Sequence, residues 1–156
     1  MGIRIRKYHK DDLIRCAKMV RETYMKCCFS DETKQASMEY MDMYDTDKNF
    51  DFTKKMMEMS KIFFVATVDG HIVGLVRGSK ERIRGLYVDY RYHRKGVGRA
   101  LLKKFEKEAH SEGSREIRIR GSLYAVLFYQ KEGYKKTTGI RSMGGVKIQP
   151  MKKILS

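Results

Sequence analysis

One short stretch of the sequence places three cations and two glycines directly before a run with helical spacing: Tyr92–Leu102, YHRKGVGRALL. The first turn of a helix carries unpaired N–H groups and a partial positive charge, so it attracts phosphate groups. Gly96 and Gly98 lack the side chains that would keep a phosphate away from the backbone. The stretch therefore predicts an anion-binding loop, and a tight turn on a basic, solvated face is the alternative.

Two common phosphate-binding signatures are excluded by the sequence. No glycine in the chain is followed by lysine, so the chain has no P-loop. The dinucleotide-binding pattern G-x-G-x-x-G is incomplete because Leu101 stands at the position of the third glycine. If the loop binds phosphate, it belongs to another class of site.

A second stretch whose residues could take part in a reaction is Ser122–Tyr134. It reads SLYAVLFYQKEGY and carries Tyr129 on an expected short helix. Taken alone, Tyr129 is typical of an amphipathic aromatic side chain packed under a sheet. Together with HRKGVG, His93–Gly98, the stretch resembles the two signatures of the GNAT superfamily of acyl-CoA-dependent N-acetyltransferases. These signatures are Q/R-x-x-G-x-G/A and N-x-x-A-x-x-L/F-Y-E-K-x-G-F/Y, from which His93 and Ser122 depart.

The resemblance is good from about Ile62 to Leu155 and includes the closing run QPMKK, Gln149–Lys153. It implies that main-chain N–H groups of the loop hold the pyrophosphate of acetyl-CoA. The residues concerned are Arg94, Lys95, Gly96, Val97, Gly98 and Arg99.

The resemblance also implies roles for the strand before the loop. The segment Leu86, Tyr87, Val88 would line the pantetheine arm, with Leu86 and Val88 bonding it through their main chains. The Val88 amide would polarise the thioester carbonyl, an effect worth roughly 3 kcal/mol for one oxyanion donor. Ser122 would contact CoA from the position of the family's Asn, and Tyr129 would protonate the departing thiolate.

The chemistry of amine acetylation makes these roles reasonable. A primary amine has an ordinary pKa near 10.4, so it must lose a proton before it attacks at neutral pH. A departing thiolate, comparable to a thiol of pKa about 8.5, needs only modest help from a tyrosine hydroxyl. The sequence names no base for the amine. Glu81 lies near the expected strand, and a solvated salt bridge with neighbouring arginines is its alternative role.

Alternating apolar patterns predict the elements that position these residues. An Asp69-Gly70 pair between two β-rich runs is the strongest hairpin signal in the sequence. Expected strands cover 3–6, 62–68, 71–77, 83–88, about 117–119 and 146–154; expected helices cover 13–24, one or two segments within 32–60, the run from the glycine loop to about 113, and 124–132. With the resemblance, this order implies an α/β (α+β) fold. We expect a single N-acetyltransferase domain over residues 1–156, with a GNAT-like mixed, mostly antiparallel sheet of six to seven strands and about four helices.

Composition limits the class of protein. The chain has 156 residues and 42% apolar residues, and its longest apolar runs fall far short of the roughly 20 needed to span a bilayer. No signal-peptide pattern opens the sequence, so we expect a cytoplasmic protein without a membrane partner. The cysteines, Cys16, Cys27 and Cys28, have no C-x-x-C spacing, which argues against a disulfide framework and against a metal site.

The charge is unevenly distributed. Asp31–Glu58 carries eight acids against four lysines, a net −4, which leaves +19 on the remainder of a chain whose total is +15. In the GNAT fold this region commonly lines the acceptor side, so the resemblance favours a cationic amine such as a lysine, a polyamine or an aminoglycoside-like molecule. A solvated helix face is the alternative, and a protein N-terminus stays open as acceptor.

Two other function classes stay open. The high basicity could serve nucleic acid, with Tyr and Arg side chains stacking on bases, although the motifs make this partner unlikely. The fold could also bind acyl-CoA without turnover, as a regulatory domain. The sequence leaves the oligomeric state open, a homodimer included.

Overall fold

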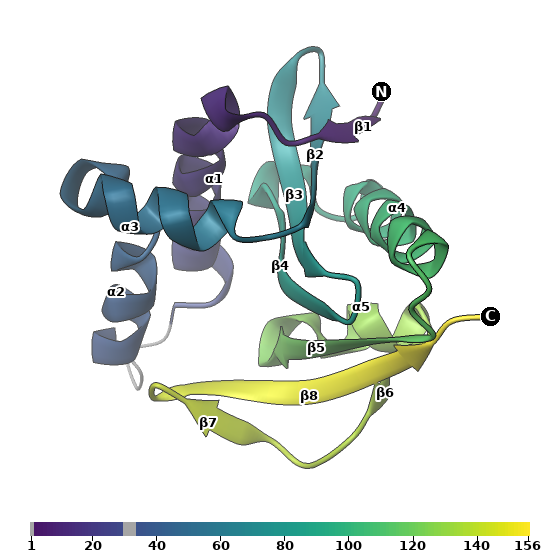
Figure 1. The fold of residues 1–156 in the computed structure, drawn as a ribbon. Helices are drawn as coiled ribbons and strands as arrows, with labels where there is room; N and C mark the ends of the chain where they lie inside the picture. The colour runs from purple at the N-terminus through teal and green to yellow at the C-terminus, as the bar shows by residue number, and fades with distance from the viewer. Residues whose placement is uncertain (1, 30–33) are drawn as a thin grey trace.

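The computed structural model describes residues 2–29 and 34–156 (Figure 1). The strands are β1 (Arg4–Lys7), β2 (Ile62–Val68), β3 (His71–Ser79), β4 (Arg82–Val88), β5 (Glu116–Ser122), β6 (Lys135–Lys136), β7 (Arg141–Met143) and β8 (Val146–Ile154). The α-helices are α1 (Leu13–Cys27), α2 (Lys34–Asp42), α3 (Thr46–Glu58), α4 (Val97–Ser111) and α5 (Val126–Lys131). Short 3-10 turns are η1 (Lys10–Asp12), η3 (Tyr90–Tyr92) and η4 (Leu123–Ala125).

All described strands belong to one sheet with the order β1-β2-β3-β4-β5-β8-β6, and β7 pairs with β8. Only β4 and β5 pair in parallel; the other neighbours are antiparallel. The expected hairpin joins β2 and β3 through Asp69 and Gly70, with φ of 51° and 80°. These angles match the turn that an Asp-Gly pair favours between twisted strands.

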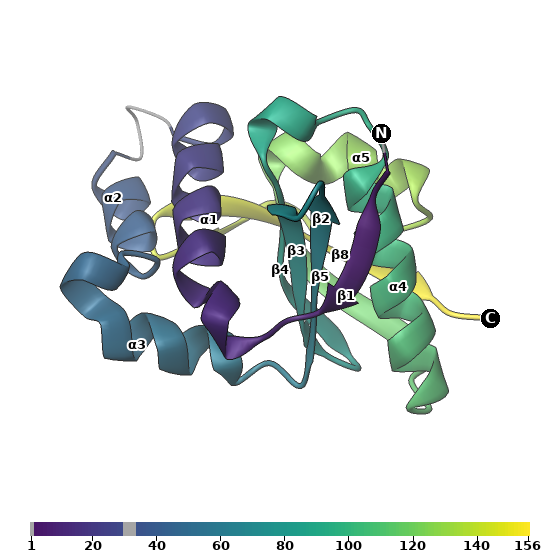
Figure 2. The ribbon, with the colours of Figure 1, turned by 90° about the horizontal axis from the view of Figure 1, so that it is seen from above.

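Helices cover the two faces of the sheet unequally. Figure 2 shows α1, α2 and α3 on one side of β2–β4 and α4 and α5 on the other. Two buried apolar clusters result, one beneath α4 and one beneath α1 and α3. All seven residues of β2 are buried because helices cover both of its faces, which is why Ile62–Val68 reads as a continuous apolar run.

The prediction of a mixed, mostly antiparallel sheet flanked by helices is confirmed, but the element counts were too low. The described residues form eight strands and five α-helices, against six to seven strands and about four helices expected. The strands without a sequence prediction are β6 and β7, with two and three residues. Both are held through main-chain pairing with β8, and segments this short carry no alternation of apolar and polar residues.

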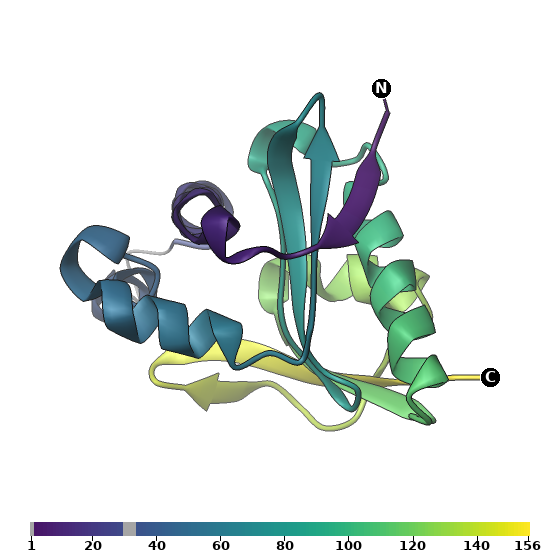
Figure 3. The ribbon, with the colours of Figure 1, turned by 45° about the horizontal axis from the view of Figure 1, so that its top comes forward.

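The β4–β5 ladder is the feature that shapes the site. It consists of two register pairs, Arg82 with Arg118 and Ile83 with Ile119. Beyond Ile83 the two strands separate, and Figures 1 and 3 show β5 and β8 turning away below β4. We call this divergence the split. In the part of the chain that the structure describes, no helix is long and apolar enough to cross a membrane.

Candidate functional site

The loop between β4 and α4 is fixed at its start by Asp89. Its carboxylate accepts hydrogen bonds from the Arg91 N–H (3.0 Å) and from Arg91 Nε and Nη2 (3.0 and 2.7 Å). The hydrogen bonds from Arg91 lower the pKa of Asp89, so this buried carboxylate stays ionised. The turn therefore enters the loop in one defined conformation.

The N–H groups of the loop are free within the fold. None of the N–H groups of residues 94–99 donates a hydrogen bond to another described residue, and the first that does is Ala100, to the Gly96 carbonyl (3.1 Å). Arg94 and Gly96 have φ of 61° and 83°, which turns the chain sharply before the helix begins. Arg94, Lys95, Gly96 and Arg99 are exposed, Gly98 is half-buried and Val97 is buried, so the unpaired amides of the exposed part of this helix N-terminus are open to an anion.

The two glycines of the loop do different things. A β-carbon on Gly96 would meet no atom within 4 Å, so packing does not require glycine at this position. The positive φ favours glycine there, and the missing side chain leaves the backbone open to a ligand. A β-carbon on Gly98 would lie 3.3 Å from the Phe128 ring and 3.5 Å from Val88 Cγ2. Gly98 therefore lets the first turn of α4 pack closely against α5 and β4, a role that the sequence did not suggest.

The main chain of β4 faces the split at Leu86 and Val88. The Asp89 N–H donates to the Val73 carbonyl (2.8 Å), which makes Asp89 and Val73 a hydrogen-bonded pair of the β3–β4 ladder. In an antiparallel ladder such pairs alternate with pairs whose N–H and C=O groups point outward. Leu86 and Val88 thus point their main-chain groups away from β3, toward a β5 that has already diverged.

Tyr87 points elsewhere. By the same alternation its main chain bonds β3, and its hydroxyl is hydrogen-bonded to Tyr40 on α2, on the face covered by α1–α3. Burial raises the pKa of Tyr87, so the hydroxyl stays neutral. Of the expected CoA-binding segment, Leu86 and Val88 lie at the split, and Tyr87 packs behind it.

His93 links the two sides of the split. Its Nε2 donates to the Val88 carbonyl (2.7 Å), and its Nδ1 accepts from the Tyr124 hydroxyl (3.4 Å). Because a carbonyl can only accept, this arrangement fixes the tautomer with the proton on Nε2. His93, which stands where the family signature has Gln or Arg, thus connects the end of β4 to η4 through its ring.

Tyr129 lies on α5 with its ring against β5. A β-carbon on Gly121 would lie 3.3 Å from that ring, and Phe128 and Tyr134 pack edge-on with ring centroids at 5.2 and 5.6 Å. Burial raises the pKa of Tyr129, and no hydrogen bond among the described residues uses its hydroxyl. Among the described residues, the fully buried side-chain polar atoms that lack a hydrogen-bond partner are Arg21 Nε and Arg77 Nε. The Tyr129 hydroxyl is not one of them, so it keeps some contact with solvent. The raised pKa keeps the proton on this hydroxyl at neutral pH, as a general acid requires.

Ser122 closes β5 at the open end of the split. It pairs with Ile148 of β8, and its side chain makes no capping bond to η4. The Cys28 thiol at the end of α1 lies against Ser122, and burial raises the pKa of this thiol to about 11. Cys28 is therefore a neutral neighbour of the site and not a thiolate nucleophile.

Several carboxylates of the acidic segment already have partners in the fold. Asp45 is buried, caps α3 through the N–H groups of Asp47 and Lys48, and lies 3.5 Å from Arg21. Asp42 lies 3.7 Å from Lys48. Asp31 and Glu32 fall outside the described residues.

Glu81, the candidate base, is exposed in the turn between β3 and β4, seven residues before Val88 and thus at the far end of β4. No ion pair joins Glu81 to an arginine within the described part of the chain.

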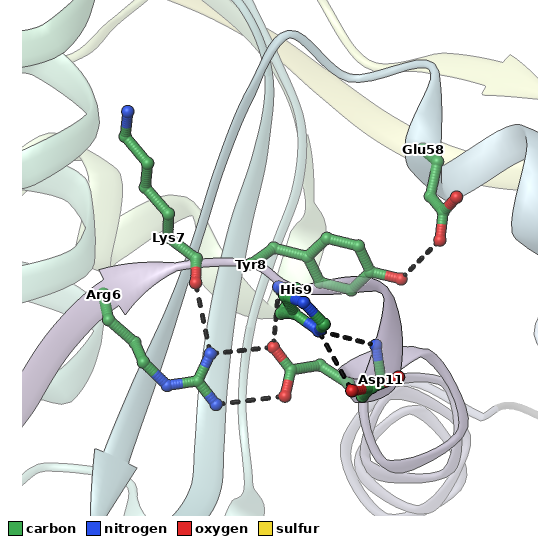
Figure 4. Close-up of polar contacts among 7 residues, drawn as sticks. Arg6, Lys7, Tyr8, His9, Asp11 and Glu58 are labelled. Carbon is green, nitrogen blue, oxygen red and sulfur yellow. Dashed lines mark hydrogen bonds and ion pairs between the residues drawn. The ribbon is translucent and has the colours of Figure 1, made fainter.

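A separate cavity of about 340 Å³ lies at the opposite end of α4. Tyr8, Glu58 and Glu108 are among its lining residues. Figure 4 shows the Tyr8 hydroxyl directed at the Glu58 carboxylate, to which it donates at 2.9 Å. From Gly96 to Glu108 the helix rises roughly 18 Å, so this cavity is not part of the split. Among residues 2–29 and 34–156, no group of three or more His, Cys, Asp or Glu side chains could hold a metal ion.

Sequence comparisons identify relatives of the chain. A family model described as "Acetyltransferase (GNAT) domain" matches residues 28–155. Human N-acetyltransferase 8 is 29% identical over 118 residues, which cover 67% of this chain and 52% of that protein. Acetyltransferase SG1711 from Sodalis glossinidius (strain morsitans) is 30% identical over 105 residues, 63% of this chain and 74% of that protein. The chain thus spans about half the length of the human relative.

Solved structures show the same fold. A GCN5-related N-acetyltransferase from Rhodopseudomonas palustris superposes with a TM-score of 0.84 at 23% identity, covering 99% of this chain and 97% of the other. The PaiA N-acetyltransferase from Thermoplasma acidophilum, solved in complex with coenzyme A, has a TM-score of 0.77 at 22% identity and covers 99% and 100%. At these identities the likeness concerns the fold alone, whereas the family model spans most of the sequence. The chain belongs to the GNAT acetyltransferase family.

Proposed function

We propose that this protein, with residues 1–156 as one catalytic domain, transfers an acetyl group from acetyl-CoA to a primary amine in a ternary complex. One observation carries the proposal. Six successive free amides, residues 94–99, stand at the head of a split whose walls are the Leu86–Val88 main chain and the β5 segment beside Tyr129. A site built in this way suits a ligand with a diphosphate at one end and a long polar arm.

Binding of acetyl-CoA would use the chain as follows. The amides of 94–99 hold the pyrophosphate, and the exposed side chains of Arg94 and Lys95 add positive charge around it, with Arg99, which pairs with Glu132 at 3.4 Å, contributing less. The outward main-chain groups of Leu86 and the Val88 N–H bond the pantetheine arm and its thioester as an added strand would, while the Val88 carbonyl already accepts from His93 Nε2. Ser122 contributes one hydroxyl from the opposite wall. CoA supplies the acetyl group as a thioester, and no metal takes part in the proposed reaction.

The chemical step needs one hydrogen-bond donor to the thioester oxygen and one acid for the departing sulfur. The Val88 N–H donates to the thioester carbonyl oxygen, where negative charge accumulates as the amine nitrogen attacks the carbonyl carbon. As the new C–N bond forms and the C–S bond breaks, the Tyr129 hydroxyl gives its proton to the departing sulfur. The raised pKa of Tyr129 keeps that proton available across neutral pH. Tyr129 regains a proton from water.

The amine enters the reaction as an ammonium ion and must shed one proton before attack and a second during it. Because Glu81 lies at the far end of β4, we propose that these protons pass to water and not to a carboxylate. The rate at neutral pH is then limited by the small fraction of free amine.

The sequence favours a cationic acceptor, or else a protein N-terminus. This part of the proposal stays a prediction, and the internal partners of Asp42 and Asp45 reduce its support. A cytoplasmic location, the absence of a membrane partner and homodimer formation also stay predictions from the sequence.

The proposal is tested by incubating the protein and acetyl-CoA with a panel of amines while released free thiol is detected. The panel contains polyamines, lysine, an aminoglycoside and short peptides with free amino termini. Thiol release that depends on an amine supports the proposal. Acetyl-CoA that raises the melting temperature without thiol release would indicate a binding domain instead. A strongly salt-dependent response to oligonucleotides, with none to CoA, would favour nucleic acid.

A further inference from the structure

Four arginines gather where the β4–β5 ladder ends. We call them the arginine cluster: Arg82, Arg84, Arg118 and Arg120. Arg82 stands opposite Arg118 in the ladder, and Arg84 and Arg120 follow two residues later on their strands. The cluster therefore occupies the base of the split, with two arginines on each wall.

The β5 members of the cluster lie on a sheet face that α4 and α5 do not cover. Ile117 and Ile119 are buried in the apolar cluster beneath α4, whereas Arg118 and Arg120 are exposed. Since side chains alternate along a strand, the arginines point to the opposite face. Helices α4 and α5 close one face of the split, so an acceptor must approach from the face that the arginines border.

The arginine cluster has little counter-charge of its own. Arg118 pairs with Glu116 at 2.8 Å, a carboxylate that Lys152 also approaches at 4.0 Å. The other three members form no ion pair with any described residue. Burial, and then the positive charges of the other three members, lower the pKa of Arg82. Like charges this close repel one another, and a bound anion relieves that repulsion.

A fifth arginine adjoins the cluster on β3. Arg77 stands opposite Gly85, the residue that follows Arg84. Its side chain is 5% exposed and donates to the Tyr44 hydroxyl (3.0 Å) and to Ser60 Oγ (3.3 Å), and its Nε has no partner among the described residues. No carboxylate described in the structure neutralises it, so Arg77 adds positive charge in a poorly solvated position beside the cluster.

The spacing relates the cluster to the proposed reaction. Arg84 precedes Val88 by four residues, and Arg120 precedes Ser122 by two. At about 3.3 Å per strand residue, the arginine α-carbons lie roughly 7 to 13 Å from the end of the split where the acetyl group would react. An extended peptide covers that span in roughly two to four residues.

We propose that the arginine cluster binds a carboxylate of the acceptor, and that the acceptor is an acidic peptide with a free amino terminus. Its acidic side chain would stand at the second to fourth position, because that places it over the cluster when the amine reaches the thioester. This inference rests on the proposed acetyltransferase function. Arginine suits the task because its planar guanidinium binds a carboxylate through two parallel hydrogen bonds.

The test uses ten-residue peptides that differ only at positions 3 and 9. Three carry glutamate, glutamine or lysine at peptide position 3, and a fourth carries glutamine there and glutamate at peptide position 9. We expect kcat/KM to be roughly 10-fold or more higher for glutamate at position 3 than for glutamine. Lysine should be poorest, and the distant glutamate should equal glutamine. The advantage should shrink with added salt.

Variants assign that preference to the arginines. In the double variant Arg84→Gln/Arg120→Gln the ratio of kcat/KM for the glutamate and glutamine peptides should fall toward one. Arg120→Glu should turn the preference toward the lysine peptide. The matched control is Arg4→Gln, an exposed arginine on β1 at the other edge of the sheet, for which the described residues supply no ion-pair partner. It should keep the wild-type ratio.

Failure of this inference differs from failure of the proposed function. Equal use of all four peptides, a preference for lysine or polyamines, or a ratio unchanged in the double variant would overturn the arginine subsite while acetylation stands. Oligonucleotide binding lost in the double variant, with an unchanged peptide ratio, would assign the arginines to nucleic acid. If no amine causes thiol release and acetyl-CoA does not raise the melting temperature, the proposed function itself is overturned.

Discussion

The Phe128 ring lies 3.3 Å from the point where a β-carbon on Gly98 would stand. This contact joins the first turn of α4, which carries the free amides, to α5, which carries Tyr129. The loop and the candidate acid are thus held in register by direct packing.

Gly98→Ala should disturb both helices. The added methyl group must displace the Phe128 ring by a few tenths of an ångström. Overpacking costs about 1–3 kcal/mol of unfolding free energy, and the roughly 1 kcal/mol that alanine gains over glycine in a helix leaves a net loss of up to about 2 kcal/mol. Urea unfolding should show that loss, and the rise in melting temperature with acetyl-CoA should shrink. Gly139→Ala is the control, because a β-carbon there meets no atom within 4 Å. Equal effects of the two substitutions would show that the contact with Phe128 does not matter.

Tyr129→Phe should lower kcat by roughly 100-fold, the lower end for loss of a general acid, because a thiolate departs with modest help. Binding of acetyl-CoA, measured by calorimetry, should change little because the ring remains. The matched control is Tyr134→Phe, which removes the hydroxyl that donates to Glu106 at 2.9 Å. That variant should lose about 1 kcal/mol of stability and keep kcat. An unaffected kcat in Tyr129→Phe would remove Tyr129 from the mechanism.

The rate should rise with pH from 7 to 10 without a falling limb. Burial raises the pKa of Tyr129 above its ordinary value of 10.0, so the phenol keeps its proton throughout this range. A lysine or polyamine amine, with an ordinary pKa near 10.4, becomes increasingly deprotonated over the same range. A peptide amino terminus, with an ordinary pKa of about 8, is largely deprotonated by pH 9, so with that acceptor the rise should level off there. A profile of kcat/KM against pH tests both groups. A decline below pH 10 that disappears in Tyr129→Phe would show that the phenol ionises early.

The Arg6–Asp12 pair should contribute to acid stability. The Arg6 guanidinium donates to both Asp12 oxygens (2.8 and 3.0 Å), and the His9 N–H donates to one of them (2.8 Å), in the segment shown in Figure 4. Burial alone would raise the pKa of Asp12, but these hydrogen bonds outweigh it and lower the pKa. The pair's contribution is therefore present above pH of about 3.9, the unfolded value, and is lost as pH falls through the lower folded pKa.

Asp12→Asn should thus lower the unfolding free energy at pH 7 by about 1–3 kcal/mol and flatten its decline below pH 4. Urea unfolding at pH 7, 4 and 3 measures both effects. Asp11→Asn, with a side chain 81% exposed, is the control and should change stability by less than about 0.5 kcal/mol. A parallel decline in wild type and Asp12→Asn would contradict the assigned pKa.

Local chemistry determined much of this protein in advance. The Asp69-Gly70 turn, the strands on either side of it and the apolar face of α4 follow from residues that are neighbours in the chain. The open loop at Gly96 is of the same kind, because a positive φ and a helix start are short-range properties. Such features are readable from sequence since turn and helix preferences depend on a few adjacent residues.

Only the tertiary structure decided how far the two walls of the split diverge and what borders it. The β4–β5 ladder stops after two pairs, one of which places Arg82 beside Arg118, 36 positions later in the chain. The contacts of His93 with Tyr124 and of Gly98 with Phe128 also cross some thirty positions. No local pattern marks such pairs, because each partner obeys its own strand or helix preference equally well whether the other is near or far. The arrangement is set when the helices bury their apolar faces against the sheet, and this burial brings distant residues together.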